Sequence, residues 1–349
     1  MFAHLHPDPA LLEAQKNTFR THLEKLLRAP EEPSPAGLSY LPAPADYRYA
    51  PETSESVQLL VIGGTRTESI LYRRDTREFT RHRHTPTPTL RRARDFLDLL
   101  RSVREPTSSL VLNFTFPMRP YLRGTRLDGT LLRGTKAHTL TDLVGKSIGA
   151  YLETHLDRHP QVVVVNDITV LLTSFASQGV RVAGVLGTGG NFGLSHAGQC
   201  VNLETGNYND FGVDEAVAVI DRESDNPGAQ LWEKSTSGKY LKDQFNYYAA
   251  QTGLSLRMRT SHELDDVHEI TAAALGEAVY RRSASKVAVS IAALLEVANS
   301  NTLVMEGGVF WEAYGYSGYV REYLRLLGHP TLTIIESAEP FGNLATLLA

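Results

Sequence analysis

The four valines at residues 162–165, followed at once by Asn166 and Asp167, form the most restrictive pattern in this chain. A β-branched apolar run without polar alternation predicts a strand buried on both faces, as in the sheets of α/β proteins. Such sheets bind ligands beyond the carboxyl ends of their strands, where partial burial raises the pKa of a carboxylate toward that of a general base. Asp167 is therefore a candidate general base. The alternative is that Asn166 and Asp167 only cap a helix that begins near Thr169.

Three apolar runs end in a glycine-rich turn. Residues 59–62 precede Gly63-Gly64-Thr65, residues 182–186 precede Gly187-Thr188-Gly189-Gly190, and residues 303–305 precede Glu306-Gly307-Gly308. Glycine lets backbone N–H groups approach an anion closely, so these turns predict phosphate contacts. The second turn is not a dinucleotide-binding loop, because Phe192 stands where that fingerprint requires its third glycine. The alternative is that these are ordinary hairpin turns, and each further occurrence of an apolar run followed by a glycine turn weakens that alternative.

The composition is that of an ordinary soluble globular protein, with 42% hydrophobic and 21% charged residues among 349. A net charge of −4 argues against nucleic acid as the main partner. No apolar run approaches the ~20 residues that span a bilayer, and the N-terminus lacks the pattern of a signal peptide. The single cysteine, Cys200, permits no intrachain disulfide. We therefore expect a cytoplasmic protein with two domains and with no membrane or nucleic-acid partner.

Helical and extended patterns alternate along the chain, which indicates an α/β fold. We expect helices over residues 8–28, 88–104, 139–157, 227–252, 263–278, 279–298 and 317–327. We expect two strands within residues 57–72, around the first glycine turn, and others at 110–114, 162–165, 182–186, 302–305 and 331–335. The prolines between residues 30 and 51 predict an extended linker.

Two other patterns predict no site. Residues 145–147, Gly-Lys-Ser, are similar to the end of a P-loop, but Leu140 stands where the earlier glycine is required, so helix is expected there. His82 and His84 could suggest a metal site. We expect exposed surface instead, because no acidic or cysteine partner lies nearby in the sequence.

Several segments match, in order, the motifs of one known family. They are Leu38-Ser39-Tyr40-Leu41-Pro42, Phe114-Thr115-Phe116-Pro117, Thr135-Lys136, Asn166-Asp167, Asn202-Leu203-Glu204, and the block Asn-Pro-Gly-Ala-Gln-Leu-Trp-Glu-Lys at residues 226–234 with its continuation Ser-Gly-Lys-Tyr-Leu at 237–241. The block at 226–241 is the most specific of these. On these residues the chain resembles the hexokinases, sugar kinases of the actin-like ATPase superfamily, and looks like a divergent, bacterial-type member.

The resemblance implies a two-domain actin-like ATPase fold, of the ribonuclease H-like kind, with a cleft between the domains. The implied division is an N-terminal helix and proline-rich linker over residues 1–56, a small domain over 57–165 with 337–349, and a large domain over 166–336. Closure of such domains over a substrate would expel water and limit wasteful ATP hydrolysis.

The implied activity is ATP-dependent phosphorylation of a hexose, with glucose as the expected substrate and its 6-hydroxyl as the acceptor. Asp167 would be the general base, and Lys136 would neutralise charge on the transferred group. The implied substrate-binding residues are Thr115, Phe116, Thr135, Lys136, Asn166, Asp167, Asn191, Glu204, Gln230 and Glu233. The implied nucleotide contacts are Gly63, Gly64, Thr65, Gly187, Thr188, Gly189, Gly190, Lys239, Ser283, Gly307 and Gly308. Magnesium would arrive with ATP and be held mainly by it, with no dedicated metal site in the protein.

The chain departs from the family at the first glycine turn. Val61 stands where the family has the aspartate that helps to position magnesium, and residues 66–68, Arg-Thr-Glu, replace the usual Asn, Phe and Arg. Gly190 replaces a larger side chain in the second turn. The alternative function is therefore a sugar-binding sensor or regulator with weak or no kinase activity. The preferred hexose, the phosphoryl donor and the oligomeric state stay open.

Overall fold

A computed structural model describes residues 2, 5, 7–32, 34, 36–51, 54–135 and 138–348. By their contacts, the residues form two compact units. Unit 1 comprises Met1–Tyr40, Gly179–His196 and Leu203–Ser337, and unit 2 comprises Leu41–Gln178, Ala197–Asn202 and Ala338–Ala349. Unit 2 carries the first glycine turn, and unit 1 carries the second and third.

Unit 2 is built on a five-stranded sheet in the order β4-β3-β2-β5-β8. The strands are β2 (Ser56–Ile62), β3 (Arg66–Arg73), β4 (Glu78–Pro86), β5 (Ser109–Phe114) and β8 (Gln161–Val165). β5 runs parallel to both β2 and β8, whereas β3 is antiparallel to β2 and to β4. The valines at 162–165 are buried in β8, as the unbroken apolar run predicts.

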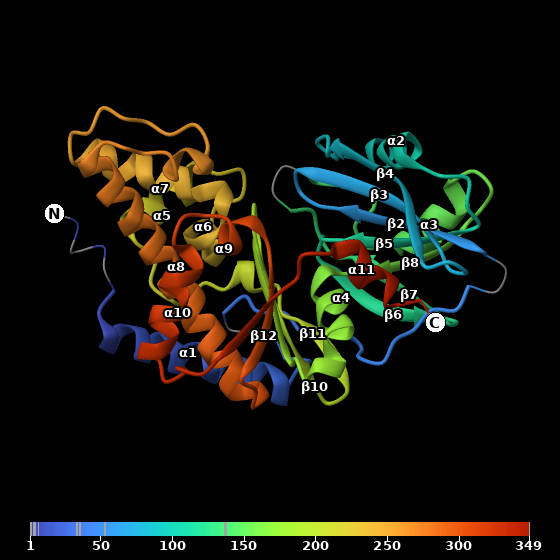
Figure 1. Cartoon of the computed structure of the whole chain (residues 1–349), viewed down its shortest axis with the longest axis horizontal. Coiled ribbons are helices and arrows are strands. Elements are labelled where there is room, and N and C mark those ends of the chain that lie inside the picture. The colour runs from blue at the N-terminus through green and yellow to red at the C-terminus, as the bar shows by residue number, and fades with distance from the viewer. Residues whose placement is uncertain are drawn as a thin grey trace. The chain divides into compact units, whose positions relative to one another are not determined.

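Alternate residues of these strands enter two apolar cores, one on each face of the sheet. One core receives side chains from α2 (Ala93–Val103) and α3 (Ile148–His155). The other receives them from α4 (Asp167–Ser174) and α11 (Pro340–Ala345). Figure 1 shows α11 in front of this sheet, close to β2, with which it is in contact. Helix α4 therefore starts at the end of β8 and packs back onto the sheet.

Two smaller strand pairs complete unit 2. β6 (Met118–Arg123) and β7 (Arg126–Leu131) form an antiparallel hairpin. β1 (Leu41–Pro44) pairs antiparallel with β11 (Gln199–Asn202). Within the stretch expected to be an extended linker, residues 41–44 are extended and also pair with a neighbouring strand. Proline lacks an N–H group, and the sheet tolerates Pro42 and Pro44 because β1 is an edge strand.

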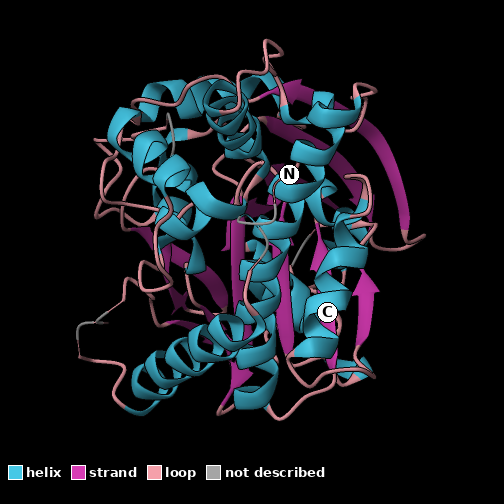
Figure 2. Cartoon of the chain, turned by 90° about the vertical axis from the view of Figure 1, so that its left-hand side faces the viewer, coloured by secondary structure: helices cyan, strands magenta, loops and turns pink. Residues whose placement is uncertain are grey.

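Unit 1 combines a sheet with a layer of helices. Its strands, β10 (Gly190–His196), β9 (Val182–Leu186), β12 (Thr302–Glu306) and β13 (Thr333–Glu336), follow one another in that order. Helix α8 (Ile270–Ala298) contacts β9 and β10 and lies beside α1 (Pro9–Arg28) and α10 (Tyr316–Leu326). Figure 2 looks onto this helical side of the unit. The other helices are α5 (Glu215–Glu223), α6 (Leu231–Thr236), α7 (Gly238–Gln251) and α9 (Gly308–Trp311).

Several helix boundaries differ from the sequence expectation. The two helices expected at 263–278 and 279–298 are one, α8, because Ala, Ser and Val continue the helix with no breaker between them. The single helix expected at 227–252 is interrupted at Ser237, whose backbone is extended (φ −88°, ψ 156°). Helix α3 begins only at Ile148. Within the described residues, no helix is both long and apolar enough to cross a membrane.

Candidate functional site

Three predicted site segments of unit 2 meet at one edge of its sheet. Gly63 follows β2, Thr115 follows β5 and Asn166 follows β8. These strands are parallel neighbours, so their carboxyl ends lie together. Thr115 Oγ1 donates a hydrogen bond of 3.1 Å to Ile62 O and so joins two of the neighbouring loops. Ligands of α/β sheets bind at this kind of edge.

Asp167 is the first residue of α4, and Asn166 is its N-cap. The N–H of Ile168 donates to Asn166 Oδ1 at 3.0 Å and to Asp167 Oδ1 at 2.8 Å. The capping role is therefore present, but it does not exclude a role with a ligand. The amide nitrogen of Asn166 is buried and has no hydrogen-bond partner among the described residues, so a ligand oxygen could satisfy it. The helix N-terminus also favours a charged carboxylate at Asp167.

His138 ties the turn that carries Thr135 to the first glycine turn. Thr135 and His138 exchange backbone hydrogen bonds of 2.9 and 3.0 Å. The N–H of Leu90 donates to His138 Nδ1 at 3.1 Å, so Nε2 carries the proton and donates to Gly64 O at 2.9 Å. The motifs identified in the sequence do not include His138. Its ring holds two loops of the candidate site together.

Two further predicted residues belong to the same part of unit 2. Phe116 is fully buried, and its ring stacks on Phe114 with 4.3 Å between centroids. Its backbone is therefore fixed within the core, and its contact with a substrate stays a prediction. Lys136 lies outside the described residues.

The strand position before the first glycine turn is apolar. Val61 is half-buried and packs against the core on the α4 and α11 face. Its partner across the ladder is Glu68, whose carboxylate lies 3.0 Å from Arg66 Nε and 3.1 Å from His82 Nε2. The fold thus brings an acidic neighbour to His82 from the adjacent strand, and His82 itself is exposed, as expected. No metal cluster follows, because the described residues contain no group of three or more His, Cys, Asp or Glu side chains that could hold an ion.

The P-loop-like residues 145–147 lead into α3, where an internal carboxylate occupies the helix N-terminus. Asp128 is fully buried and accepts from the N–H groups of Gly149 at 2.7 Å and Ala150 at 3.0 Å. Ser147 Oγ donates to the same carboxylate at 2.6 Å. Residues 145–147 are turn and N-cap instead of the expected helix. The groups that would bind an external phosphate are used by Asp128.

In unit 1, the second and third glycine turns and the start of α7 converge. Gly187 O accepts from the N–H of Gly238 at 2.8 Å, and Thr188 O accepts from that of Lys239 at 3.3 Å. Gly307 has φ 115°, a conformation that side chains rarely adopt, and a Cβ there would collide with Leu186 O. Glycine at 307 thus lets the third turn approach the second. The predicted nucleotide contacts at 187–188, 239 and 307–308 therefore lie in one region of unit 1.

The predicted sugar-binding residues of unit 1 form a connected set beside these turns. Glu233 is nearly fully buried; its Oε2 accepts from the N–H of Gly190, and its Oε1 from Gln230 Nε2, both at 3.1 Å. Asn191 Oδ1 accepts from the N–H of Thr205 at 3.0 Å. Gln230 and Glu204 both have left-handed backbones, with φ 55° and 49°. Two non-glycine residues in that conformation within one cluster are typical of a functional site.

Gly190 is explained by its neighbour Trp232. A Cβ at position 190 would lie 2.6 Å from Trp232 Cζ3. The indole is fully buried and donates from Nε1 to Ser290 Oγ at 3.0 Å, so it is held in place. The glycine that departs from the family pattern is therefore required by this chain's own packing.

Ser283 lies inside the packing of α8 and α10. Its hydroxyl is fully buried, donates to Thr236 O at 2.9 Å and lies 2.6 Å from the hydroxyl of Tyr316. A contact with nucleotide stays a prediction for this residue. Lys234, in the specific block at 226–241, is also fully buried and bonds Asp221 at 2.6 Å and Asn226 O at 2.9 Å. It fixes the loop that leads to Gln230.

Sequence reasoning missed three buried polar groups near these sets. Asn113 Oδ1, Thr205 Oγ1 and Ser237 Oγ have no hydrogen-bond partner among the described residues. Asn113 lies between Val61 and Val165 in the sheet register, at the edge where the loops of unit 2 meet. A polar residue at the end of the apolar run 110–112 was the available signal. Buried polar atoms normally have partners, so each of these is a candidate ligand contact.

Comparisons with known proteins place the chain near the hexokinases. No protein-family model matches it. It is 30% identical to hexokinase-1 of Mus musculus over 172 residues, which is 42% of this chain and 17% of the mouse protein. It is 30% identical to hexokinase-7 of Oryza sativa over 155 residues, 38% of this chain and 33% of the rice protein. The match thus spans a third or less of the length of these relatives.

Solved structures show the same fold over most of the chain. A hexokinase from Schistosoma mansoni complexed with glucose aligns with a TM-score of 0.76 and 18% identity, over 98% of this chain and 96% of that one. A ROK-family glucokinase from Streptomyces griseus, in complex with glucose and AMPPNP, aligns with a TM-score of 0.61 and 15% identity, over 84% of this chain and 97% of that one. The expected resemblance to the hexokinases and the expected actin-like ATPase fold are confirmed.

Proposed function

We propose that this protein catalyses the ATP-dependent phosphorylation of a hexose, with glucose as substrate and its 6-hydroxyl as acceptor. The observation that carries the proposal is the position of Asp167 at the carboxyl end of β8, beside loops that carry a glycine turn and Thr115. A carboxylate in this place can accept the proton of a hydroxyl group that attacks a phosphoryl group. ATP and a single, buried cysteine fit a reducing, cytoplasmic setting.

The sugar would be recognised by paired acceptors and donors. Glu204, Glu233 and Asn191 would accept from its hydroxyls, and Asn166 would offer its buried amide nitrogen. Charge-assisted hydrogen bonds are the stronger kind, which suits a ligand that exposes many hydroxyls. Each buried hydroxyl left without a partner would cost about 1–3 kcal/mol. Thr135, Lys136 and Gln230 complete the proposed set.

The nucleotide would be held by backbone groups of the glycine turns and by Lys239. Magnesium fits the donor set only if the phosphates supply most of its ligands, because the side chain of Val61 offers no ligand atom and the carboxylate of Glu68 is already paired with Arg66 and His82. Magnesium commonly keeps several waters and one or two protein carboxylates. When bound, it would neutralise charge on the phosphates.

In the proposed reaction, the hexose oxygen forms a bond to the γ-phosphorus as the bond from that phosphorus to the β,γ-bridging oxygen breaks. The hydroxyl proton passes to Asp167, and ADP leaves with the bridging oxygen. Lys136 would balance charge on the transferred group. The chain's own contribution is to hold the reactants, accept the proton and exclude water.

A coupled assay with glucose, mannose and fructose against ATP, ADP and polyphosphate tests this proposal. We expect the fastest turnover with glucose and ATP, and a 6-phosphate product identifiable by phosphorus NMR. Equal turnover with the other donors would remove ATP from the proposal. Absence of turnover with all three sugars would remove the kinase activity.

A sugar-binding sensor is the second candidate, and the pairing of Val61 with Glu68 favours it. The side chain of Val61 has no atom that could bind a metal ion, and the carboxylate of Glu68, which is already paired with Arg66 and His82, would repel a nucleotide phosphate. Calorimetry separates the two functions: a sensor would bind glucose without needing nucleotide and would not consume ATP. The kinase would bind glucose and consume ATP at the same protein concentration.

A further inference from the structure

Asn113, the last residue but one of β5, carries a buried amide group that the fold does not satisfy. The residue is 5% exposed, and its Oδ1 has no hydrogen-bond partner among the described residues. Taking an amide oxygen out of water without a new hydrogen bond destabilises a fold. Almost all buried polar groups in proteins therefore have a partner. An amide that the fold leaves without one is expected to gain it from a ligand.

The neighbours of Asn113 on the same face of the sheet are apolar. The register places it between Val61 of β2 and Val165 of β8. Both valines pack into the core under α4 and α11, as does Val111, which lies two residues earlier in β5 and so on the same face. An apolar residue at position 113 would continue this core without an unpaired polar atom. The packing of the fold therefore gives no reason for an amide here.

The amide lies next to the sheet edge that carries the candidate base. Thr115 follows β5 directly, and the neighbour Val165 is the last residue of β8, with Asn166 and Asp167 immediately after it. A ligand of an α/β sheet binds beyond the carboxyl ends of its strands. Asn113 is thus at the end of the sheet where the proposed reactants would bind.

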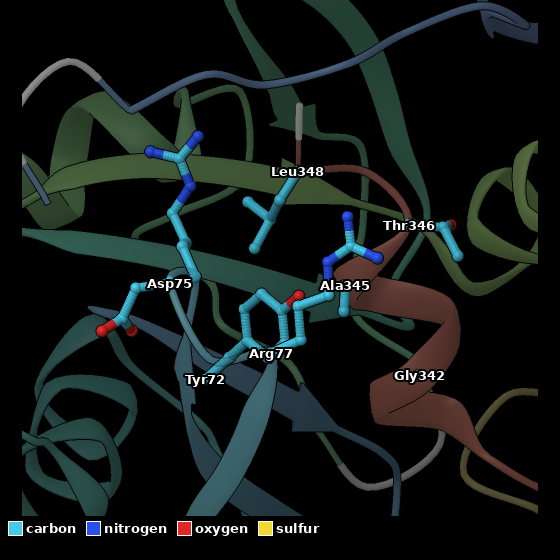
Figure 3. A pocket seen from close by; sticks show the side chains of 8 residues that line it. Tyr72, Asp75, Arg77, Gly342, Ala345, Thr346 and Leu348 are labelled. Atoms are coloured by element: carbon cyan, nitrogen blue, oxygen red, sulfur yellow. The ribbon is translucent and has the colours of Figure 1, made fainter. Parts of the chain in front are cut away.

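The open pocket of unit 2 does not explain the amide. This pocket of about 540 Å³ is lined by the turn between β3 and β4 and by residues around α11, and Asn113 is not part of its lining. Tyr72, which Figure 3 shows in that lining, pairs with Val57 near the start of β2, whereas Asn113 pairs with Val61 near its end. Four residues of a strand span about 13 Å. The pocket therefore lies toward the other end of β2.

The position of Val61 indicates what the amide replaces. The family that the chain resembles has an aspartate there, which helps to position magnesium. Here that position has no side-chain oxygen, but Asn113 offers one at the same level of the next strand and on the same face. Adjacent strands lie about 4.8 Å apart, and β5 lies between β2 and β8. The oxygen is thus displaced by one strand, toward the strand that leads to Asp167.

We propose that Asn113 is a positioning residue for magnesium, and that its Oδ1 accepts a hydrogen bond from a water of the hydrated ion. This inference rests on the proposed function, in which the ion arrives with ATP. Phosphate oxygens of the nucleotide are acceptors and cannot satisfy an amide oxygen, whereas metal-bound water donates. Magnesium commonly keeps several waters when it binds. The amide is uncharged, so it adds nothing to the negative charge of Asp167 and Glu68.

Two substitutions test the assignment by binding alone. Asn113→Leu removes both polar atoms, and Asn113→Asp keeps an acceptor and adds a charge. Calorimetry measures the affinity for AMPPNP, an ATP analogue that is not hydrolysed, over a range of magnesium concentrations, and the affinity for glucose without nucleotide. In Asn113→Leu, the magnesium concentration that gives half-maximal enhancement of AMPPNP binding should rise about fivefold or more, as for loss of one hydrogen bond. Glucose affinity should stay at the wild-type value.

The melting temperature of the ligand-free protein gives a second readout. Asn113→Leu should raise it, because an unpaired polar group leaves an apolar core. Asn113→Asp should lower it, because a charge is buried, and should need less magnesium than Asn113→Leu. Val111→Ala is the matched control on the same strand and face. It should lower the melting temperature by leaving a cavity, and keep the wild-type magnesium requirement.

The outcomes also separate this inference from the proposed function. An unchanged magnesium requirement in Asn113→Leu overturns the inference, and so does a lower melting temperature, which would show that the amide has a partner in the fold. Weaker glucose binding without nucleotide overturns it in favour of a sugar hydroxyl. If the wild type phosphorylates no hexose yet binds AMPPNP with a magnesium requirement that depends on Asn113, the proposed function fails and the inference stands. If Asn113→Leu phosphorylates a hexose with the magnesium dependence of the wild type, the inference fails and the proposed function stands.

Discussion

Val61 and Glu68 lie directly opposite each other in the antiparallel ladder of β2 and β3, so their side chains share one face of the sheet. In the family that the chain resembles, the same two positions carry an aspartate and an arginine. The opposite charges of that pair are replaced here by an apolar residue and a carboxylate. The two departures seen in the sequence are therefore one coupled change, and position 61 cannot be considered alone.

We predict that Val61→Asp lowers the free energy of unfolding. The new carboxylate would face that of Glu68, and like charges directly opposite destabilise a sheet by about 0.2–1 kcal/mol. Val61→Asn is the neutral control of the same shape. Combining Val61→Asp with Glu68→Arg restores opposite charges and should recover the lost stability. Denaturant unfolding at pH 7 measures all four proteins. A Val61→Asp protein as stable as Val61→Asn would contradict the coupling.

We predict that Gly190→Ala is destabilising by about 1–3 kcal/mol, the usual effect of overpacking a core. The added methyl group would meet the buried ring of Trp232, which is held by Ser290. Gly187→Ala is the control in the same turn, because a Cβ there meets no atom closer than 3.9 Å. Thermal and denaturant unfolding compare the two variants. Equal stability would mean that the Trp232 ring can move aside.

We predict that Lys286 makes the free energy of unfolding depend on pH. Burial lowers its pKa to about 8, against the attraction of Asp214, which lies 3.2 Å away and also pairs with Arg282. In the unfolded chain the pKa is near 10.4, so between the two values the unfolded state binds more protons. The penalty of the buried charge is present below pH 8 and is relieved as the pH rises. The free energy of unfolding should gain up to about 1.4 kcal/mol per pH unit in that window.

Lys286→Met should remove this gain and should be more stable than wild type at pH 7. Lys16→Met is the matched control. Burial lowers the pKa of Lys16, but bonds to Glu296 and Glu13 outweigh this and raise it, so Lys16 stays charged throughout the window. Urea unfolding at pH 7, 8, 9 and 10 gives, for wild type and for each of the two variants, the slope of the free energy of unfolding against pH. Parallel profiles for wild type and Lys286→Met would contradict the assignment.

Glu233 should serve both the fold and the sugar, and two substitutions separate these roles. Glu233→Gln can still accept from the N–H of Gly190, so it should keep the stability of the loop. It lacks the charge, so glucose binding should weaken by about 1.5–3 kcal/mol. Glu233→Ala should lose both. Calorimetry measures the glucose affinity of the two variants, and thermal unfolding measures their stability. Wild-type glucose affinity in Glu233→Gln would show that the carboxylate only holds the loop.

Features set by local patterns could be predicted from the sequence. The valine run predicted β8, and the strands around the first glycine turn were predicted correctly. The helix expected over residues 8–28 is α1, and Leu12, Phe19, Leu23 and Leu26 recur along it at helical spacing and are buried. Boundaries set by tertiary contacts could not be predicted. Helix α3 starts late because Asp128, some 20 residues earlier in the chain, caps it. Edge strand β1 exists because residues 199–202 offer it a partner.

In the candidate site, too, some features follow from local sequence patterns and others depend on tertiary contacts. Motif spacing identified the residues, but their relationships come from the fold. Nothing in the sequence joins Gly190 to Trp232 or Val61 to Glu68, since each pair is set by register and packing. No sequence motif includes His138, whereas its ring links Gly64 and Leu90. Contacts between residues that are distant in the sequence cannot be predicted from the local sequence patterns of one chain.

The most direct test of the account is the phosphorylation rate and glucose affinity of Asp167→Ala. The account predicts a rate reduced by about 10²–10⁴-fold or more, because a general base is lost, with glucose affinity within roughly tenfold of wild type. Asp157→Ala, an exposed aspartate of the same unit, is the control and should retain full activity. Near-normal turnover in Asp167→Ala, with ATP consumed and hexose phosphate formed at the wild-type rate, would contradict the central claim.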